Sequence, residues 1–177
     1  MPGAMKLASA TWRRVRGRPK PKVYFEEWDD PLISGIGWVS ELIEIAGGED
    51  VFPELRKQKA AKDRIVSPHD VIAAAPDIIL ASWCGKKVIP DKIRQRSGWD
   101  AIPAVRNCRI VEIKSALILQ PGPAALTDGL DAILAALGND RRVSALPSPV
   151  SNGEDPPAVI ADNFRKELSW PPRAITR

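Results

Sequence analysis

The sequence predicts an α/β fold in which a short, mostly parallel sheet is flanked by helices. Strand-like runs rich in β-branched and aromatic residues alternate along the chain with segments of helical periodicity. This order is typical of parallel strands joined by crossover helices. Apolar residues make up 44% of the 177 residues, which is enough for a packed core. No run approaches the roughly 20 apolar residues that a membrane-spanning helix needs.

The first strand is expected over Lys22–Glu26, a run of β-branched and aromatic residues that follows two prolines. A helix is expected over Val39–Ala46, because its apolar residues recur at the i, i+3, i+4, i+7 spacing of one helical face. Gly47 and Gly48 come next and predict its end, since glycine readily takes the left-handed conformation that closes many helices.

The next helix starts at Ser67, which predicts an N-cap before a proline in the first turn. Asp70 adds a negative charge near the positive end of the helix dipole. This helix should end before Pro76, and a buried strand is expected to follow over Asp77–Ala81.

The last elements are a short polar helix over Pro90–Arg96, a third strand over Arg109–Ile113, and a final helix that begins at Pro123. Gly138 and Asn139 predict the end of that helix. Its apolar stripe consists of Leu126, Leu130, Ile133, Leu134 and Leu137.

Composition divides the chain into three parts. Residues 1–21 form a basic leader, and the first 22 residues carry seven Lys and Arg and no acid. Residues 22–142 form the α/β lobe, which is mildly acidic because residues 23–138 hold 17 acidic and 13 basic side chains. Residues 143–177 contain six prolines and are expected to form a mostly disordered tail.

Several function classes are disfavoured by these features. Nucleic acid is disfavoured as a partner, because the basic leader has neither interleaved aromatics nor a recognition motif. Leu7–Ala10 is too short an apolar run for a secretory signal, so a cytoplasmic location stays open. Cys84 and Cys108 form no CxxC pair and His69 is the single histidine, so no metal centre, resident cofactor or disulfide framework is expected.

Three tryptophans fall in loops that follow or flank predicted strand ends: Trp28, Trp38 and Trp83. Ligands of open α/β sheets bind outside the carboxyl ends of the strands. A single tryptophan there is most simply explained by packing at the rim of the core. Three at one edge favour a wide aromatic surface for a large, flat ligand.

Other chemistry at these loops has weaker support. The motif G-x-G-x-x-S at 35–40 resembles a dinucleotide fingerprint, but it lies about eight residues beyond its strand and contains bulky Trp38. Cys84 lies beside Lys86 and Lys87, which could lower its pKa and make it nucleophilic. Four acidic side chains could supply paired carboxylates, although we expect a solvated rim: Glu26, Glu27, Asp29 and Asp30.

Five motifs in order carry a family resemblance that covers residues 15–138. They are E-W-D-D-P at 27–31, G-x-G-W-V-x-E-L-I-x-x-A-G-G at 35–48, S-x-x-D-V-I-A-A-A-P-D-I-I at 67–79, W-x-x-I-P-A-V-R-N-x-R-I at 99–110 and Q-P-G-P at 120–123. Together they resemble the C-terminal lobe of the periplasmic binding proteins of the vitamin B12 and iron-siderophore ABC transporter family. The likeness is closest to the cobalamin-binding branch.

This resemblance implies a small Rossmann-like three-layer lobe from a two-lobed, non-catalytic receptor whose lobes are joined by one long helix. The leader over Thr11–Gly17 resembles the last turns of that helix, so the N-terminal lobe is expected to be missing. A periplasmic location, a corrinoid or siderophore ligand, and ABC permease partners are further implications. Asp70 matches an acidic residue that docks on the permease. The family's ligand contacts carry over to Trp28, Leu32, Trp38, Trp83 and Gln120.

The resemblance therefore predicts the substrate-binding lobe of an importer for cobalamin or a related metal chelate. Two alternatives stay open. One is a small cytosolic α/β enzyme that uses Cys84 or the Glu27–Asp30 carboxylates. The other is a degenerate lobe that keeps the fold and binds nothing, an option suggested by Leu32 and Gln120. The family commonly has an aromatic and a basic residue near these two positions.

Overall fold

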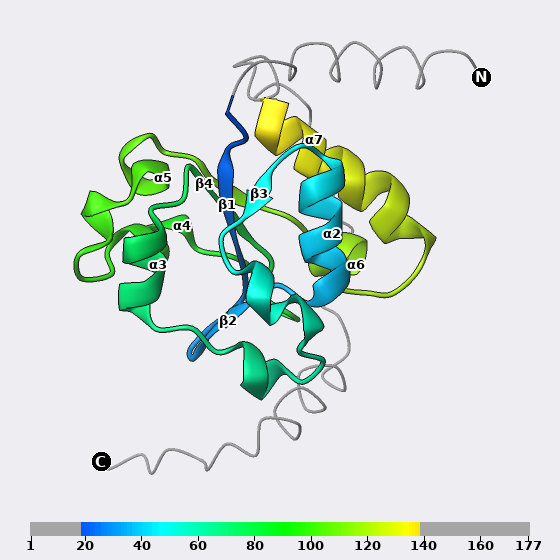
Figure 1. Ribbon diagram of the computed structural model, residues 1–177, viewed down its shortest axis with the longest axis horizontal. Helices are drawn as coiled ribbons and strands as arrows, with labels where there is room; N and C mark the ends of the chain where they lie inside the picture. The colour runs from blue at the N-terminus through cyan, green and yellow to red at the C-terminus, as the bar shows by residue number, and fades with distance from the viewer. Residues whose placement is uncertain (1–18, 139–177) are drawn as a thin grey trace.

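A five-stranded sheet runs through the centre of the computed structural model, which describes residues 19–138 (Figure 1). The strands are β1 (Lys22–Asp29), β2 (Leu32–Ser34), β3 (Glu49–Asp50), β4 (Ile78–Ala81) and β5 (Ile110–Glu112). β4 lies between β1 and β5 and pairs in parallel with both. On its other side, β1 pairs in parallel with β3 near its start and antiparallel with β2 near its end.

Helices cover both faces of this sheet, as predicted (Figure 1). One face carries α2 (Gly37–Ile45), α6 (Ser115–Ile118) and α7 (Leu130–Gly138), and the other carries α3 (Pro68–Ala74), α4 (Pro90–Arg94) and α5 (Pro103–Arg106). Single tight turns fill the connections: η1 (Pro53–Lys57), η2 (Ala61–Arg64) and η3 (Trp99–Ala101). A wide π-type turn, η4 (Ala125–Gly129), leads into α7. Among residues 19–138, none of the helices has the length and apolar character to cross a membrane.

The sheet has a separate apolar core on each face, because successive side chains of a strand point in opposite directions. Val23 and Phe25 of β1 join the core beneath α2 and α7. Tyr24, between them, joins the core beneath α3 and α5, where it contacts Phe52 and Trp99 edge-on. Burying one such side chain typically contributes about 1.5–3 kcal/mol, so the two cores together hold the three layers.

Local signals in the sequence account for the helix ends. Gly47 follows α2 with a φ of 93°, which a side chain would strain. At the start of α3 the expected cap is a full capping box. The Ser67 hydroxyl accepts a hydrogen bond from the Asp70 N–H at 3.1 Å, and the Asp70 carboxylate accepts one from the Ser67 N–H at 3.2 Å.

Three expectations about element boundaries are wrong. β1 continues three residues beyond Glu26, because the antiparallel hairpin with β2 extends its pairing to Asp29. The helix expected over 90–96 ends at Arg94. The final helix is a π-type turn before it becomes α-helical, and at Gly129 an added Cβ would lie 2.6 Å from the Leu117 carbonyl oxygen.

Most of the leader (1–21) and the whole tail (143–177) lie outside the described residues.

Candidate functional site

The three parallel strands β1, β4 and β5 end at the same edge of the sheet, and a pocket opens there. Its volume is about 240 Å³. One wall is the loop after β4 and the other is the end of β5 with the residues that follow it. The lining residues are Trp83, Gly85, Lys86, Lys87, Glu112, Ile113, Lys114 and Ser115. This is the position at which parallel α/β sheets bind ligands.

Trp83 forms part of the pocket wall but is only 2% exposed. Its indole N–H donates a hydrogen bond to Glu26 at 2.9 Å. Arg96, from the loop after α4, holds the same carboxylate with two hydrogen bonds of 2.5 and 2.9 Å. The Arg96 guanidinium also stacks 4.4 Å from the Trp99 ring. The pocket thus rests on a buried, fully paired carboxylate, which fixes the orientation of Trp83.

Glu27 points to the opposite face and has an arginine of its own. Arg64 of η2 contacts its two carboxylate oxygens at 2.6 and 3.0 Å, and the Ile36 N–H donates to it at 3.0 Å. Arg64 also donates to the Ser34 carbonyl oxygen. The solvated rim expected for the four carboxylates is therefore wrong for Glu26, which is fully buried, and for Glu27, which is 4% exposed. Asp29 is half-buried and Asp30 is exposed.

Lys86 connects two of the predicted tryptophans. Its ammonium lies 4.2 Å from the centre of the Trp28 ring and 5.2 Å from that of Trp83, and it pairs with Asp29. The Trp28 indole N–H donates to the Asp30 carbonyl oxygen at 3.0 Å. Trp28 stays half-buried, so the structure brings Trp28 and Trp83 together around one cation.

The other predicted contacts lie elsewhere along the same edge. Trp38, at the start of α2, is half-buried against the core beneath α2 and α7, and its indole N–H donates to the Ile118 carbonyl oxygen at 2.9 Å. Gln120 is exposed two residues beyond Ile118. Leu32 is buried in the core beside the β1–β2 hairpin. The five predicted contacts thus divide into a pair at Lys86, a pair near the end of α6, and one core residue.

Asp70, the predicted docking residue, is exposed at the start of α3. Its carboxylate accepts hydrogen bonds from the Ser67 hydroxyl at 2.7 Å and from the Ser67 N–H. These bonds lower the pKa of Asp70 below its usual value, so it is a carboxylate at neutral pH.

Cys84 does not have the environment of an activated thiol. Burial raises its pKa, and the nearby Glu27 charge raises it further, so the two lysines that follow in the sequence do not activate the thiol. Within residues 19–138, no group of three or more His, Cys, Asp or Glu side chains is arranged to hold a metal ion.

Among the residues that line the pocket, sequence analysis predicted only Trp83 as a ligand contact. It named Lys86 and Lys87 only as neighbours of Cys84, and it did not single out Glu112 or Lys114. Lys114 lies 3.4 Å from Glu112, whose carboxylate also accepts a hydrogen bond from the Val88 N–H at 3.3 Å. The available signal was the position of Lys114 just beyond a strand end and of Lys87 in the loop that follows another strand.

Comparison with known proteins gives a consistent set of relatives. A family model described as periplasmic binding protein matches residues 6–117. Among solved structures, a possible iron-binding periplasmic solute-binding protein of Staphylococcus epidermidis is 22% identical (TM-score 0.57), with 75% of this chain and 54% of that one covered. The vitamin B12 binding protein BtuF of Vibrio cholerae is 16% identical (TM-score 0.54; 80% and 52% covered).

A third structure, the periplasmic heme-binding protein RhuT of Roseiflexus, is 25% identical (TM-score 0.53; 76% and 53% covered). The chain therefore spans about half the length of each of these solved structures. A search of curated proteins finds no match.

Proposed function

The chain belongs to the periplasmic binding protein family, and from this premise we propose that it captures a metal chelate for an ABC importer. The observation that carries the proposal is the pocket at the common edge of β1, β4 and β5, with tryptophans beside it. The solved relatives named above bind iron, heme or vitamin B12 according to their descriptions. Within that range we propose cobalamin or a related corrinoid as the first ligand to test, because the sequence motifs resemble the cobalamin branch most closely.

In this proposal the two half-buried tryptophans, Trp28 and Trp38, stack on the flat body of the chelate. Indole rings supply a large apolar contact area with few rotatable bonds. Gln120 is exposed and donates or accepts hydrogen bonds at the chelate's rim. Trp83 and Leu32 are too deeply buried for wide contact, so they support the binding surface from behind.

The partners are proposed from the same premise. The chain covers about half of its solved relatives, so we propose that the ligand is held between this lobe and a second one. Asp70 is ionised and exposed on α3, which suits it to pair with a basic residue of a permease. We propose that this encounter takes place outside the cytoplasm and involves no covalent chemistry.

Calorimetric titration of the purified chain with cyanocobalamin, a ferric siderophore and haem tests the proposal. We expect saturable binding of at least one chelate, together with quenching of tryptophan fluorescence. Trp28→Leu and Trp38→Leu should each weaken binding about tenfold, since a stacked aromatic typically contributes about 1–1.5 kcal/mol. Ile45→Ala is the matched control, because this exposed apolar residue ends α2 at the far end from Trp38.

Each outcome has a distinct meaning. If neither tryptophan variant weakens binding, the ligand site does not lie at this edge of the sheet. If no chelate binds, adding the N-terminal lobe of a complete relative distinguishes a lobe that needs its partner from one that binds nothing.

A further inference from the structure

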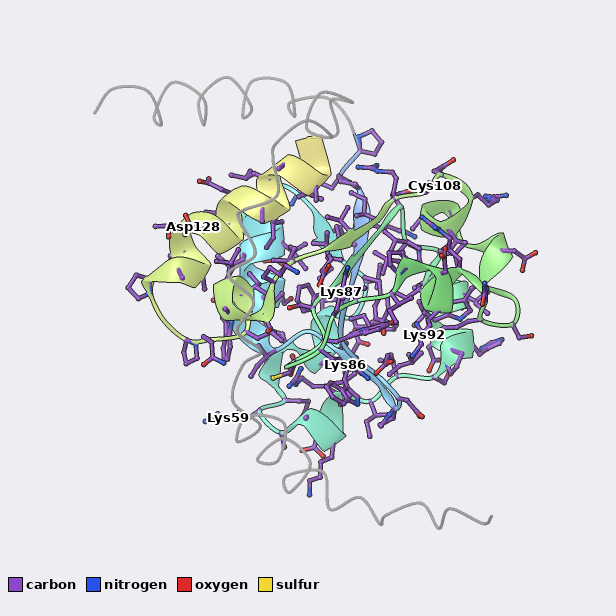
Figure 2. All side chains as sticks on the ribbon, turned by 180° about the vertical axis from the view of Figure 1, so that it is seen from behind. Lys59, Lys86, Lys87, Lys92, Cys108 and Asp128 are labelled. Carbon is purple, nitrogen blue, oxygen red and sulfur yellow. The ribbon has the colours of Figure 1, made fainter. Side chains whose placement is uncertain are left out.

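The lining of the pocket carries more positive than negative charge. Lys86, Lys87 and Lys114 line it together with one acidic residue, Glu112. Figure 2 labels Lys86 and Lys87, which follow β4, and shows Lys59 set apart from them; neither Lys59 nor Lys92 lines the pocket. This local excess contrasts with the lobe as a whole, in which residues 23–138 hold more acidic than basic side chains.

The three lysines differ in the partners they already have. Lys86 is held by Asp29 and by the faces of Trp28 and Trp83. Lys114 is 63% exposed and has only a 3.4 Å contact with Glu112. Lys87 is exposed and has no hydrogen bond or ion pair among residues 19–138. Two ammonium groups on facing walls are therefore available to a ligand.

Glu112 does not cancel this charge at the pocket. One of its carboxylate oxygens accepts hydrogen bonds from both the Val88 N–H at 3.3 Å and Lys114. It therefore ties the β4 loop to the end of β5. Because Asp29 balances Lys86, one carboxylate stands against the two remaining ammonium groups, which leaves the lining positive. The apolar residues Trp83 and Ile113 beside them reduce the screening of that charge.

The size of the pocket restricts what it can accept. Sites that enclose a whole small molecule usually measure roughly 300–1,000 Å³. A volume of about 240 Å³ is too small for a corrin or porphyrin ring, but it admits a charged side group of such a molecule. The flat body would then lie outside the pocket, toward Trp28 at the neighbouring strand end.

From these observations we propose that Lys87 and Lys114 form an anion subsite, and that the captured chelate carries a carboxylate or phosphate group that enters this pocket. The inference rests on the proposed function and adds a charge requirement to it. Lys86 is not an anchor in this scheme, because it is already paired and stacked. The Ser115 hydroxyl, on the same wall as Lys114, supplies a further donor.

Three chelates that differ in their anionic groups test the subsite: haem with two carboxylates, cyanocobalamin with one phosphodiester, and dicyanocobinamide with neither. We expect the full chain to bind haem or cyanocobalamin. The Lys87→Gln/Lys114→Gln variant should bind the same chelate at least tenfold more weakly. The loss should shrink as salt is raised. A loss with haem identifies a carboxylate as the group that enters the pocket, and a loss with cyanocobalamin identifies a phosphate.

Matched variants make the result specific. Lys59→Gln/Lys92→Gln removes the same charge from two exposed residues that do not line the pocket, and it should leave affinity unchanged. Lys87→Arg/Lys114→Arg keeps the charge and should retain most of the binding. Equal affinity of the two glutamine variants for an anionic chelate, or undiminished binding of dicyanocobinamide relative to the anionic chelates, would overturn the subsite but leave the proposed function standing.

Citrate alone separates failure of the subsite from failure of the proposed function. Amide NMR shifts at Gly85 and Ser115 that saturate with citrate, and vanish in Lys87→Gln/Lys114→Gln, would support the subsite even if no chelate bound. Shifts of equal size around Lys59 and Lys92 would overturn it.

Discussion

Two groups of charged residues lie within a short distance of the end of β1, and they differ in what their charges are bound to. Glu26 and Glu27 are buried, and each is held by an arginine from a distant part of the chain. Lys87 and Lys114, at the pocket, are exposed and largely unpaired. The first group fixes the backbone and Trp83, whereas the second leaves charge available to a ligand. Charge in the same region thus has a structural role below the surface and, we propose, a binding role above it.

The largest expected effect is the loss of Arg64, the more deeply buried arginine. Arg64→Met leaves Glu27 buried without its cation, and breaking a buried ion pair typically destabilises a protein by about 3–5 kcal/mol. Urea denaturation followed by circular dichroism measures the loss. The double variant Glu27→Gln/Arg64→Met should recover part of it. A loss below about 1 kcal/mol would mean that these charges are not structural.

Removal of Arg96 should have a smaller effect, because its side chain is 18% exposed and water can reach part of the carboxylate it leaves. We expect Arg96→Met to destabilise the fold by about 2–3 kcal/mol. A change in tryptophan emission should accompany it, since Glu26 also holds the Trp83 indole N–H. An unchanged emission spectrum would argue against this carboxylate as the support of Trp83.

Exposed lysines of the pocket should contribute little to stability. Lys86→Gln removes a partly exposed pair with Asp29 and two stacking contacts, so we expect a loss of about 0.5–1 kcal/mol. Lys87→Gln should change stability by no more than about 0.5 kcal/mol. Parallel urea titrations of the two variants compare them directly. A loss of several kcal/mol at Lys87 would mean that the pocket lysines belong to the structural group.

The smallest effect concerns pH. The pKa of Asp70 is lower in the folded chain than in the unfolded one, because the carboxylate accepts hydrogen bonds from Ser67. Its contribution is therefore present above the unfolded pKa and is lost as the pH falls through the lowered folded value. Denaturation midpoints of the wild type and Asp70→Asn should differ at pH 7 and converge in acid. Midpoints that diverge as the pH falls would contradict the assignment.

Sequence patterns predicted the fold well where a local signal determined the element. The β-branched runs that begin at Lys22 and Asp77 predicted two of the strands, and the Ser67 cap predicted the start of α3. These elements could be predicted because strand propensity and helix capping depend on residues close together in the sequence. β2 was missed because a strand of three residues after Pro31 has too little pattern to detect. The likeness to solved periplasmic binding proteins also supports the α/β class.

The candidate site was less predictable, since it depends on contacts between distant segments. Strand ends correctly indicated the edge at which the pocket lies. No periodicity could show that Glu27 meets Arg64 from 37 positions away, or that Lys114 faces the loop after β4. Burial of Trp83 was likewise hidden, because the Glu26 carboxylate that accepts its N–H lies 57 positions earlier in the chain.

The strand order described above also makes the two walls of the pocket unequal in how readily they open. The loop with Trp83 follows β4, which is hydrogen-bonded to a strand on both sides, whereas Lys114 follows β5, which in residues 19–138 pairs only with β4. Edge strands open locally at lower free energy than interior ones, so their amides exchange with deuterium sooner. We therefore expect the wall that carries Lys114 to be the more compliant side of the pocket, and the amides of β5 to exchange sooner than those of β4.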